Sequence, residues 1–207
     1  MLLDNFIAFE GIDGTGTSTQ LKLLSQRPEH EHFFITAEPT TNETGKFIRQ
    51  VLGGHIKVHH DTITYLFAAD RNEHLYSPNG IIDNLHRNKI VLTDRYLFSN
   101  LAYQSILGGK DLPAYLNASF PLPKLVFFFD LEPRIALDRI QKRGNDKEIY
   151  EKVDFLTQVS NAYHSLFEEY KVKTPDMQIV HIDASNSIEK TAQIIWSYIT
   201  KLPILKK

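Results

Sequence analysis

The segment that most constrains this chain lies near its start, in residues 6–20. Residues 6–9 (Phe-Ile-Ala-Phe) are a short apolar run of the kind that forms a buried strand. Three closely spaced glycines follow, and glycine permits tight backbone turns that other residues avoid. A helical pattern then begins at Thr17 and continues to about residue 26. This order of strand, glycine turn and helix predicts the first unit of an α/β fold.

The glycine turn has the spacing of a phosphate-binding P-loop, which is Gly, four residues, Gly, then Lys and Ser or Thr. Thr17 stands where this pattern has its lysine, and Ser18 supplies the hydroxyl that normally contacts Mg²⁺. In such a loop, backbone N–H groups and the N-terminal dipole of the next helix bind phosphate oxygens. A turn without a ligand is the alternative. The expected phosphate-binding residues are Gly11, Gly14, Thr15, Gly16, Thr17, Ser18 and Thr19.

Five apolar runs of strand length alternate with helical patterns along the chain. After residues 6–9, the predicted strands are 32–36, 89–93, 125–130 and 178–182. The central runs are apolar throughout, as expected of parallel strands buried on both faces. The sequence therefore predicts a three-layer α/β fold of the P-loop NTPase type, with a five-stranded parallel sheet covered by helices on both faces. We expect residues 1–207 to form a single domain, since this length suits one core.

Composition argues against several classes of function. The net charge is −2, so nothing indicates a basic surface that would bind nucleic acid. Cysteine is absent, which excludes disulfides and thiolate metal sites. The longest apolar run, 125–129, is too short to span a membrane and we see no signal peptide, so we expect a cytoplasmic protein. His55, His59 and His60 lie close together, but a solvated loop is favoured over a metal site there.

Three further segments narrow the interpretation when they are taken with the glycine turn. They are Phe-Ala-Ala-Asp-Arg at residues 67–71, Asp-Arg-Tyr at 94–96 and Ser-Asn-Leu-Ala-Tyr-Gln at 99–104. With these segments in this order, the sequence resembles the thymidylate kinases, which phosphorylate dTMP to dTDP with ATP. The resemblance covers nearly the whole chain. The resemblance implies a P-loop α/β fold, a homodimer, Mg²⁺, ATP as phosphoryl donor and dTMP as acceptor, with a role in dTTP biosynthesis.

Two helix faces are expected to form a thymine pocket. Phe67 and Arg71 are four residues apart and share a face, where the ring suits stacking on a base and the guanidinium suits a base carbonyl. Asn100, Tyr103 and Gln104 also share a face, and the Gln104 amide can both donate to and accept from thymine. The resemblance places Tyr103 near the sugar 2′ position. The alternatives are a core phenylalanine and polar side chains that simply meet water.

Two charged residues directly follow the third predicted strand. Asp94 and Arg95 should therefore lie at the carboxyl edge of the sheet, beside the glycine turn. Arg95 would clamp the transferring phosphoryl oxygens. Asp94 would either hold Mg²⁺ through water, together with Ser18, or orient Arg95. The resemblance assigns Asp13 to the acceptor's sugar 3′-hydroxyl and Arg49 to the acceptor phosphate, although an exposed helix charge explains Arg49 equally well.

The chain departs from the family pattern at two positions where cations are usual. Thr17 replaces the P-loop lysine, and Ala37 stands where bacterial members carry an arginine. The loss of one charge-stabilising donor typically costs about 10²–10³ in rate. For phosphoryl transfer at an ordinary rate, another cation of the protein must supply this charge.

The lid-like segment at about residues 141–152 is the expected source of that charge. We expect one or more of its cations to close over ATP, namely Lys142, Arg143 and Lys147. A solvated basic turn is the alternative. The expected catalytic residues are then Asp13, Asp94, Arg95 and Arg143.

Three functions are compatible with these residues. The first is a dTMP kinase, and the second is a catalytically impaired protein that still binds dTMP or another nucleotide. The third is a kinase of a different deoxynucleoside monophosphate. The pair Phe67 and Arg71, with Gln104, favours thymine, whereas the retention of Asp94 and Arg95 favours an active enzyme.

Overall fold

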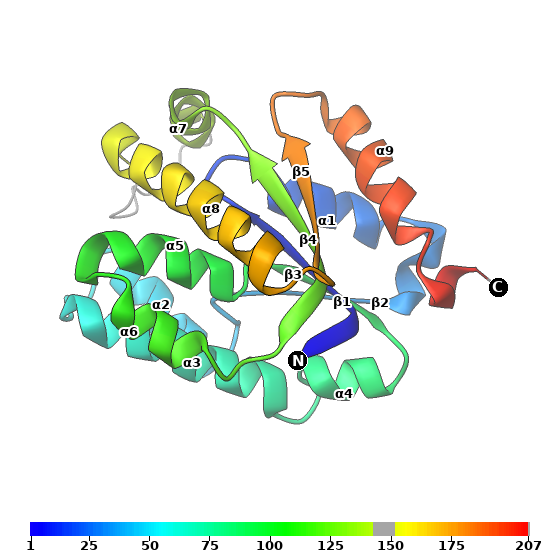
Figure 1. Cartoon of the computed structure of the whole chain (residues 1–207), viewed down its shortest axis with the longest axis horizontal. Coiled ribbons are helices and arrows are strands. Elements are labelled where there is room, and N and C mark those ends of the chain that lie inside the picture. The colour runs from blue at the N-terminus through cyan, green and yellow to red at the C-terminus, as the bar shows by residue number, and fades with distance from the viewer. Residues whose placement is uncertain (143–151, 207) are drawn as a thin grey trace.

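The computed structural model describes residues 1–142 and 152–206 and contains one five-stranded sheet. Its strands all run parallel, in the order β2-β3-β1-β4-β5 (Figure 1). Their bounds are β1 Leu2–Gly11, β2 Phe33–Ala37, β3 Ile90–Asp94, β4 Leu122–Asp130 and β5 Gln178–Asp183. The predicted α/β fold with a five-stranded parallel sheet is confirmed.

Helices cover both faces of this sheet (Figure 1). On one face α1 and α9 pack together; on the other, α5 packs against α8, and α3 packs against both α2 and α5. Among the described residues, none of the helices has the length and apolar character needed to cross a membrane. The bounds are α1 Thr17–Ser25, α2 Glu43–Leu52, α3 His60–Tyr76, α4 Ile81–His86, α5 Leu97–Gly108, α6 Asp111–Asn117, α7 Pro133–Lys142, α8 Val153–Lys173 and α9 Ile188–Ile199, with short 3₁₀ helices at Pro28–His32 and Pro203–Leu205.

The central position of β1 brings the carboxyl ends of three strands together. β1 pairs with β3 so that Phe9 lies opposite Asp94, and with β4 so that Gly11 lies opposite Phe129. On the other side of β3, Ala37 also lies opposite Asp94. The glycine turn, Asp94 and position 37 therefore share one edge, which is where open parallel sheets bind ligands.

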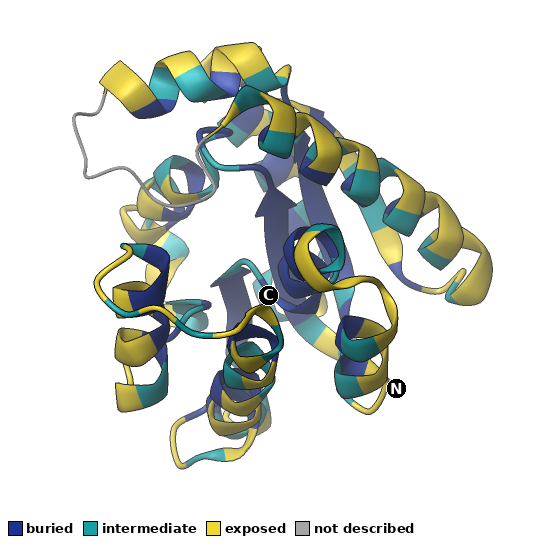
Figure 2. Cartoon of the chain, turned by 90° about the vertical axis from the view of Figure 1, so that its left-hand side faces the viewer, coloured by how far each residue is buried: buried dark blue, intermediate teal, exposed yellow. Residues whose placement is uncertain are grey.

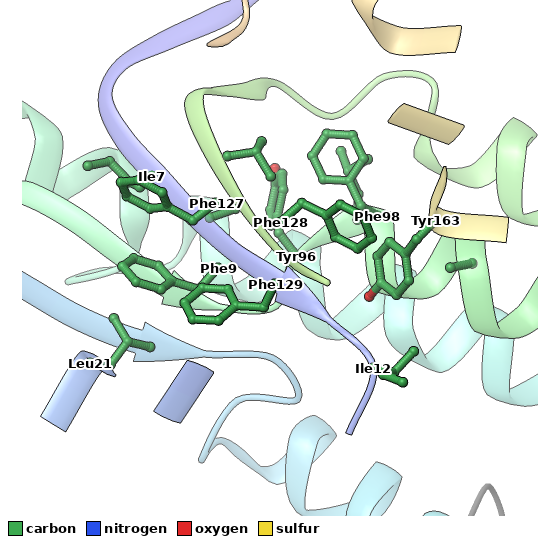
Figure 3. Packing of buried hydrophobic residues seen from close by; sticks show 14 of the residues in the cluster. Ile7, Phe9, Ile12, Leu21, Tyr96, Phe98, Phe127, Phe128, Phe129 and Tyr163 are labelled. Carbon is green, nitrogen blue, oxygen red and sulfur yellow. The ribbon is translucent and has the colours of Figure 1, made fainter. Parts of the chain in front are cut away.

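Phenylalanines near the end of β4 fill both sides of the sheet. The rings of Phe127 and Phe129 lie 5.2 and 5.9 Å from that of Phe9. Phe128 points to the opposite side and stacks on Tyr163 of α8 at 5.5 Å (Figure 3). This alternation is the two-residue period of a strand, and each fully buried ring contributes about 1.5–3 kcal/mol. Figure 2 shows the buried residues gathered along the sheet and on the inner sides of the helices.

The largest differences from the sequence expectations are at β1, at β4, which starts at Leu122 rather than at residue 125, and at α6. β1 starts at Leu2 rather than at residue 6, because its first residues pair with the start of β4. Helix α6 has no counterpart among the predicted elements. It has seven residues and contains Pro113, so its sequence is too short to show a helical period.

Candidate active site

The glycine turn connects β1 to α1 in a conformation that depends on glycine. Gly14 and Gly16 have φ values of +85° and +97°, which L side chains rarely adopt. A Cβ on Gly11 would lie 2.6 Å from the Phe129 carbonyl oxygen, and one on Gly14 would lie 2.5 Å from that of Ala136. The turn is therefore held closely against β4 and α7. It presents the N-terminus of α1, whose unpaired N–H groups favour anions.

Two hollows border this turn. One of about 230 Å³ lies beside α7 and the start of α9 and is bordered by Arg139, whose Nη1 donates to the Ala184 carbonyl at 3.0 Å. The other has about 110 Å³ and reaches the end of β3. Apart from Gly11, each predicted phosphate-binding residue lines at least one of them: Gly14, Thr15, Gly16, Thr17, Ser18 and Thr19.

Ser18 and Asp94 are in direct contact beside the glycine turn. The Ser18 hydroxyl donates to Asp94 Oδ2 at 2.5 Å and so joins the first turn of α1 to the end of β3. Hydroxyl and carboxylate oxygens are the ligands that Mg²⁺ prefers, together with water and substrate phosphates. The predicted metal-site residues are thus adjacent, and their chemistry fits Mg²⁺.

Arg95 lies where β3 turns into α5, in the left-handed region at φ +69°. Its N–H donates to the Phe9 carbonyl at 2.9 Å, which helps to hold a conformation that typically costs about 1–3 kcal/mol. The side chain reaches the glycine turn, where Nη2 donates to Asp13 Oδ1 at 2.7 Å and Nη1 donates to the Gly11 carbonyl at 2.9 Å. Burial opposes the charged form, yet the neighbouring Tyr103 and Asp13 raise the pKa of Arg95 above its ordinary value. Arg95 is therefore a fixed cation beside the turn.

A further cavity of about 230 Å³ is bordered by Asp13 and Arg95, which also line the smaller hollow at the glycine turn. Side chains from α2, α3 and α5 line it, together with the segment that follows β2. All eight residues predicted to bind the acceptor border this cavity: Asp13, Arg49, Phe67, Arg71, Arg95, Asn100, Tyr103 and Gln104.

Arg71 is almost completely buried at the wall of this cavity, with 1% of its surface exposed. Its Nη2 donates to Glu38 Oε2 at 2.6 Å, and its Nη1 donates to Asn117 Oδ1. The buried Nε has no hydrogen-bond partner in the described structure. An unsatisfied buried donor costs about 1–3 kcal/mol, so this N–H suits an acceptor atom on a ligand.

The α5 side of the cavity is already ordered by hydrogen bonds. The Tyr103 hydroxyl donates to Asp13 Oδ2 at 2.9 Å and accepts from the Asp13 N–H at 3.2 Å. Burial raises the pKa of Tyr103, so this hydroxyl stays neutral. Asn100 Nδ2 donates to Gln104 Oε1 at 3.1 Å, and Asn100 Oδ1 accepts from Asn117 Nδ2 at 2.6 Å. Asn100 therefore orients its neighbours as well as lining the cavity.

Arg49 borders the cavity from α2, and its guanidinium lies on the segment that follows β2. Its two terminal nitrogens donate to the carbonyl oxygens of Pro39 and Thr40. Asp70 of α3 holds the same segment, because its carboxylate accepts from the Thr40 N–H at 2.7 Å and from the Thr40 and Thr44 hydroxyls at 2.6 Å each. The segment around Arg49 is thus fixed by α3.

Known proteins resemble this chain over most of its length. The model of the family described as thymidylate kinase matches residues 9–195. The chain belongs to the thymidylate kinase family. It is 40% identical to a "Putative thymidylate kinase" of Treponema pallidum, with 99% of both chains covered. It is 37% identical to a "Probable thymidylate kinase" of Methanocaldococcus jannaschii, over 98% of this chain and all of the relative. It is also 37% identical to a "Thymidylate kinase" of Leptospira interrogans, over 81% of this chain and 84% of the relative.

Several residues that shape this thymidylate kinase-like site were not predicted from the sequence. They are the buried polar partners of predicted residues: Glu10, Glu38, Asp70, Ser99, Asn117 and Tyr163. Glu10 and Glu38 do carry a signal, since each is a charged residue directly beside an apolar strand. Asn117 carries no such signal in the sequence, because its helix α6 was not expected.

The structure describes the surroundings of Ala37, but it describes only part of the lid-like segment that was expected to supply the missing charge. Ala37 borders a larger hollow of about 680 Å³ that also touches Ser18 and Asp94, so the space beside the missing arginine is open. Arg143 and Lys147 lie outside the described residues, as does most of the lid-like segment. Lys142 is the exposed last residue of α7.

Proposed function

We propose that this protein transfers the γ-phosphoryl group of ATP to dTMP, giving dTDP and ADP. The observation that carries the proposal is the cavity that gathers all eight predicted acceptor residues and meets the phosphate hollow at Asp13 and Arg95. A nucleoside monophosphate in the cavity and a nucleoside triphosphate at the glycine turn would then meet end to end at Asp13 and Arg95. Membership of the thymidylate kinase family supports dTMP as the acceptor.

Phosphoryl transfer depends mainly on positioning and on stabilising charge. An oxygen of the dTMP phosphate attacks the γ-phosphorus in line, and the bond from that phosphorus to the bridging oxygen of ADP breaks. Arg95, held by Asp13 and Gly11, would contact the transferring phosphoryl oxygens. Mg²⁺ bound at Ser18 and Asp94 would neutralise charge on the phosphates of ATP.

The cavity residues suit thymine recognition. Phe67 would stack on the base, and the Arg71 guanidinium would donate to a base carbonyl. The amide of Gln104 would meet the Watson–Crick edge, with Asn100 orienting it. Tyr103 would lie near the sugar 2′ position.

The charge missing at Thr17 is proposed to come from the end of α7 or from the residues that follow it in the sequence. Arg143, Lys142 and Lys147 are the candidates, and Arg143 is the first choice because in the sequence it stands four residues after Arg139, which borders the hollow beside α7 and the start of α9. A turnover measurement on Arg143→Ala decides this point. Unchanged kcat would remove Arg143 from the mechanism.

We also propose a homodimer, with α3 and α5 as the candidate interface, and a cytoplasmic location. Tyr65 of α3 and Leu107 of α5 are large apolar side chains that the single chain leaves 54% and 42% exposed. Light scattering after gel filtration measures the mass directly. A monomer at the concentration of the activity assay would contradict the dimer.

A coupled assay of ADP release with ATP and each deoxynucleoside monophosphate tests the function. We expect dTMP to give the highest kcat/KM. Binding of dTMP without ADP release from any acceptor would instead support the impaired nucleotide-binding protein. Thr17→Lys is the companion variant: a large gain in kcat indicates a weakened site, and a loss indicates a site rebuilt around threonine.

A further inference from the structure

Glu10 is a carboxylate buried within the core of the molecule, with 0% of its surface exposed. It lies near the end of β1, directly before the glycine turn. Its Oε1 accepts from the Tyr96 N–H at 2.8 Å, and its Oε2 accepts from the Ser99 hydroxyl at 2.6 Å and the Tyr163 hydroxyl at 2.9 Å. One side chain thus connects β1 with α5 and with α8.

Two of these donors also contact Arg95. Nη1 of Arg95 donates to Ser99 Oγ at 3.1 Å and lies 3.5 Å from the Tyr163 hydroxyl oxygen. The two hydroxyl oxygens are 2.7 Å apart. Glu10, Ser99, Tyr163 and Arg95 therefore form one continuous polar chain that ends at the glycine turn.

The charge on Glu10 sets the direction of the hydrogen bonds in this chain. An ionised carboxylate only accepts, so the Ser99 and Tyr163 protons turn towards Glu10 and their lone pairs face Arg95. A neutral partner at position 10 can donate, which releases those protons to turn towards the guanidinium. The guanidinium has donors only, so it would then face donors instead of acceptors.

Burial raises the pKa of Glu10 to about 7, although the Ser99 hydrogen bond, the Arg95 charge and the Tyr163 hydrogen bond lower it. Arg95 is the charged group that faces Glu10, and Tyr163 is the titratable group that faces it from α8. Tyr96 contributes its backbone N–H. Ionisation of Glu10 therefore falls near neutral pH.

We infer that Glu10 is a positioning residue for phosphoryl transfer, which aims the Arg95 guanidinium at the glycine turn through Ser99 and Tyr163. This inference rests on the proposed kinase function. Glu10 itself lines neither the acceptor cavity nor the two hollows at the glycine turn, so its effect on the reaction passes through Arg95.

Glu10→Gln tests the inference, because it keeps the shape of the side chain and replaces one acceptor with a donor. We expect kcat at pH 8 to fall roughly 10- to 100-fold, as misplacement by about 1 Å does, while KM for ATP and dTMP changes by less than about 3-fold. The rise of wild-type kcat through pH 7 should be absent from the variant. Tyr163→Phe and Ser99→Ala should each lower kcat in the same direction, and they keep the test available if Glu10→Gln fails to fold.

Phe128→Leu is the matched control. Phe128 stacks on Tyr163 but has no polar atom in the chain, so this variant loosens the packing of α8 and should keep the rise of kcat through pH 7. A folded Glu10→Gln with wild-type kcat and an unchanged pH profile would overturn the inference. So would a pH profile altered equally in Phe128→Leu.

A crystal structure of Glu10→Gln tests the position of Arg95 without any measurement of activity. Arg95 Nη1 should leave the Gly11 carbonyl and Ser99 if Glu10 positions it, and should keep both if Glu10 does not. Absence of ADP release from the wild type would contradict the proposed function alone, since this structural result stands independently of it.

Discussion

Arg95 is the residue at which the two halves of the site meet. It borders both the cavity proposed for the acceptor and the smaller hollow at the glycine turn, and its guanidinium is bound to Asp13 and Gly11. Its backbone is held in a left-handed conformation that places the side chain there. A residue held in a strained conformation by its surroundings typically has a functional reason to be there.

Arg95→Ala should therefore lower kcat about 10²–10³-fold, the usual cost of removing one charge-stabilising donor. Steady-state kinetics with saturating dTMP and ATP measure it. Arg87→Ala is the control, since Arg87 is an exposed arginine of the helix end before β3. A kcat within about 3-fold of wild type would exclude Arg95 from charge stabilisation.

The buried Glu10 also makes stability depend on pH. Its pKa rises from 4.5 to about 7 on folding, so between these values the folded protein keeps a proton that the unfolded chain has released. The free energy of unfolding therefore falls as pH rises through this window. Relative to wild type, Glu10→Gln should gain about 3 kcal/mol between pH 4.5 and pH 7.5, because one pKa unit corresponds to about 1.4 kcal/mol.

Urea unfolding of both proteins at the two pH values measures this difference, and the contributions of all other groups cancel. A difference that stays constant with pH would show that folding does not raise the pKa of Glu10.

At the scale of secondary elements, α3 fixes the segment between β2 and α2. Helix α2 also packs closely on this segment at Gly45, where an added Cβ would lie 1.9 Å from the Thr40 carbonyl oxygen. Asp70 holds the same segment through three hydrogen bonds to Thr40 and Thr44. The acceptor side of the site thus depends on the fit between two helices.

Gly45→Ala should destabilise the protein by about 1–3 kcal/mol, the usual cost of overpacking, and should raise KM for dTMP more than KM for ATP. The reason is that the displaced segment carries the carbonyl groups that hold Arg49. Lys46→Ala, an exposed neighbour on α2, is the control. Equal changes in the two KM values would contradict a local effect.

The elements of the sheet could be predicted from sequence because each strand is an apolar run bounded by clear breaks. The residues that line the proposed acceptor cavity could be predicted because three segments resemble those of the thymidylate kinases. Helical spacing agrees with this, since it places Phe67 with Arg71, and Asn100 with Gln104. Their buried partners could not, since the pairing of Arg71 with Asn117 joins residues 46 positions apart across an unpredicted helix. Long-range polar contacts of this kind leave no local pattern in the sequence.

For the molecule as a whole, ligand binding should raise thermal stability. At about 100 times its Kd, a ligand that binds only the folded state adds about 2.7 kcal/mol. For a chain of this length, that corresponds to a Tm increase of roughly 5–10 °C. We expect this increase with dTMP and a clearly smaller one with dCMP at the same concentration, measured by differential scanning calorimetry. Equal shifts would contradict thymine selectivity.

The order of the strands has a further consequence for how the molecule opens. β1, which leads into the glycine turn, is paired on both sides, whereas β2, which leads into the acceptor segment, is an edge strand paired only with β3. Backbone amides in doubly paired strands exchange with solvent only on global unfolding, whereas those near an edge also exchange through local opening. Hydrogen exchange should therefore be slow in β1 and faster in β2, so that the ATP side stays rigid while the dTMP side fluctuates.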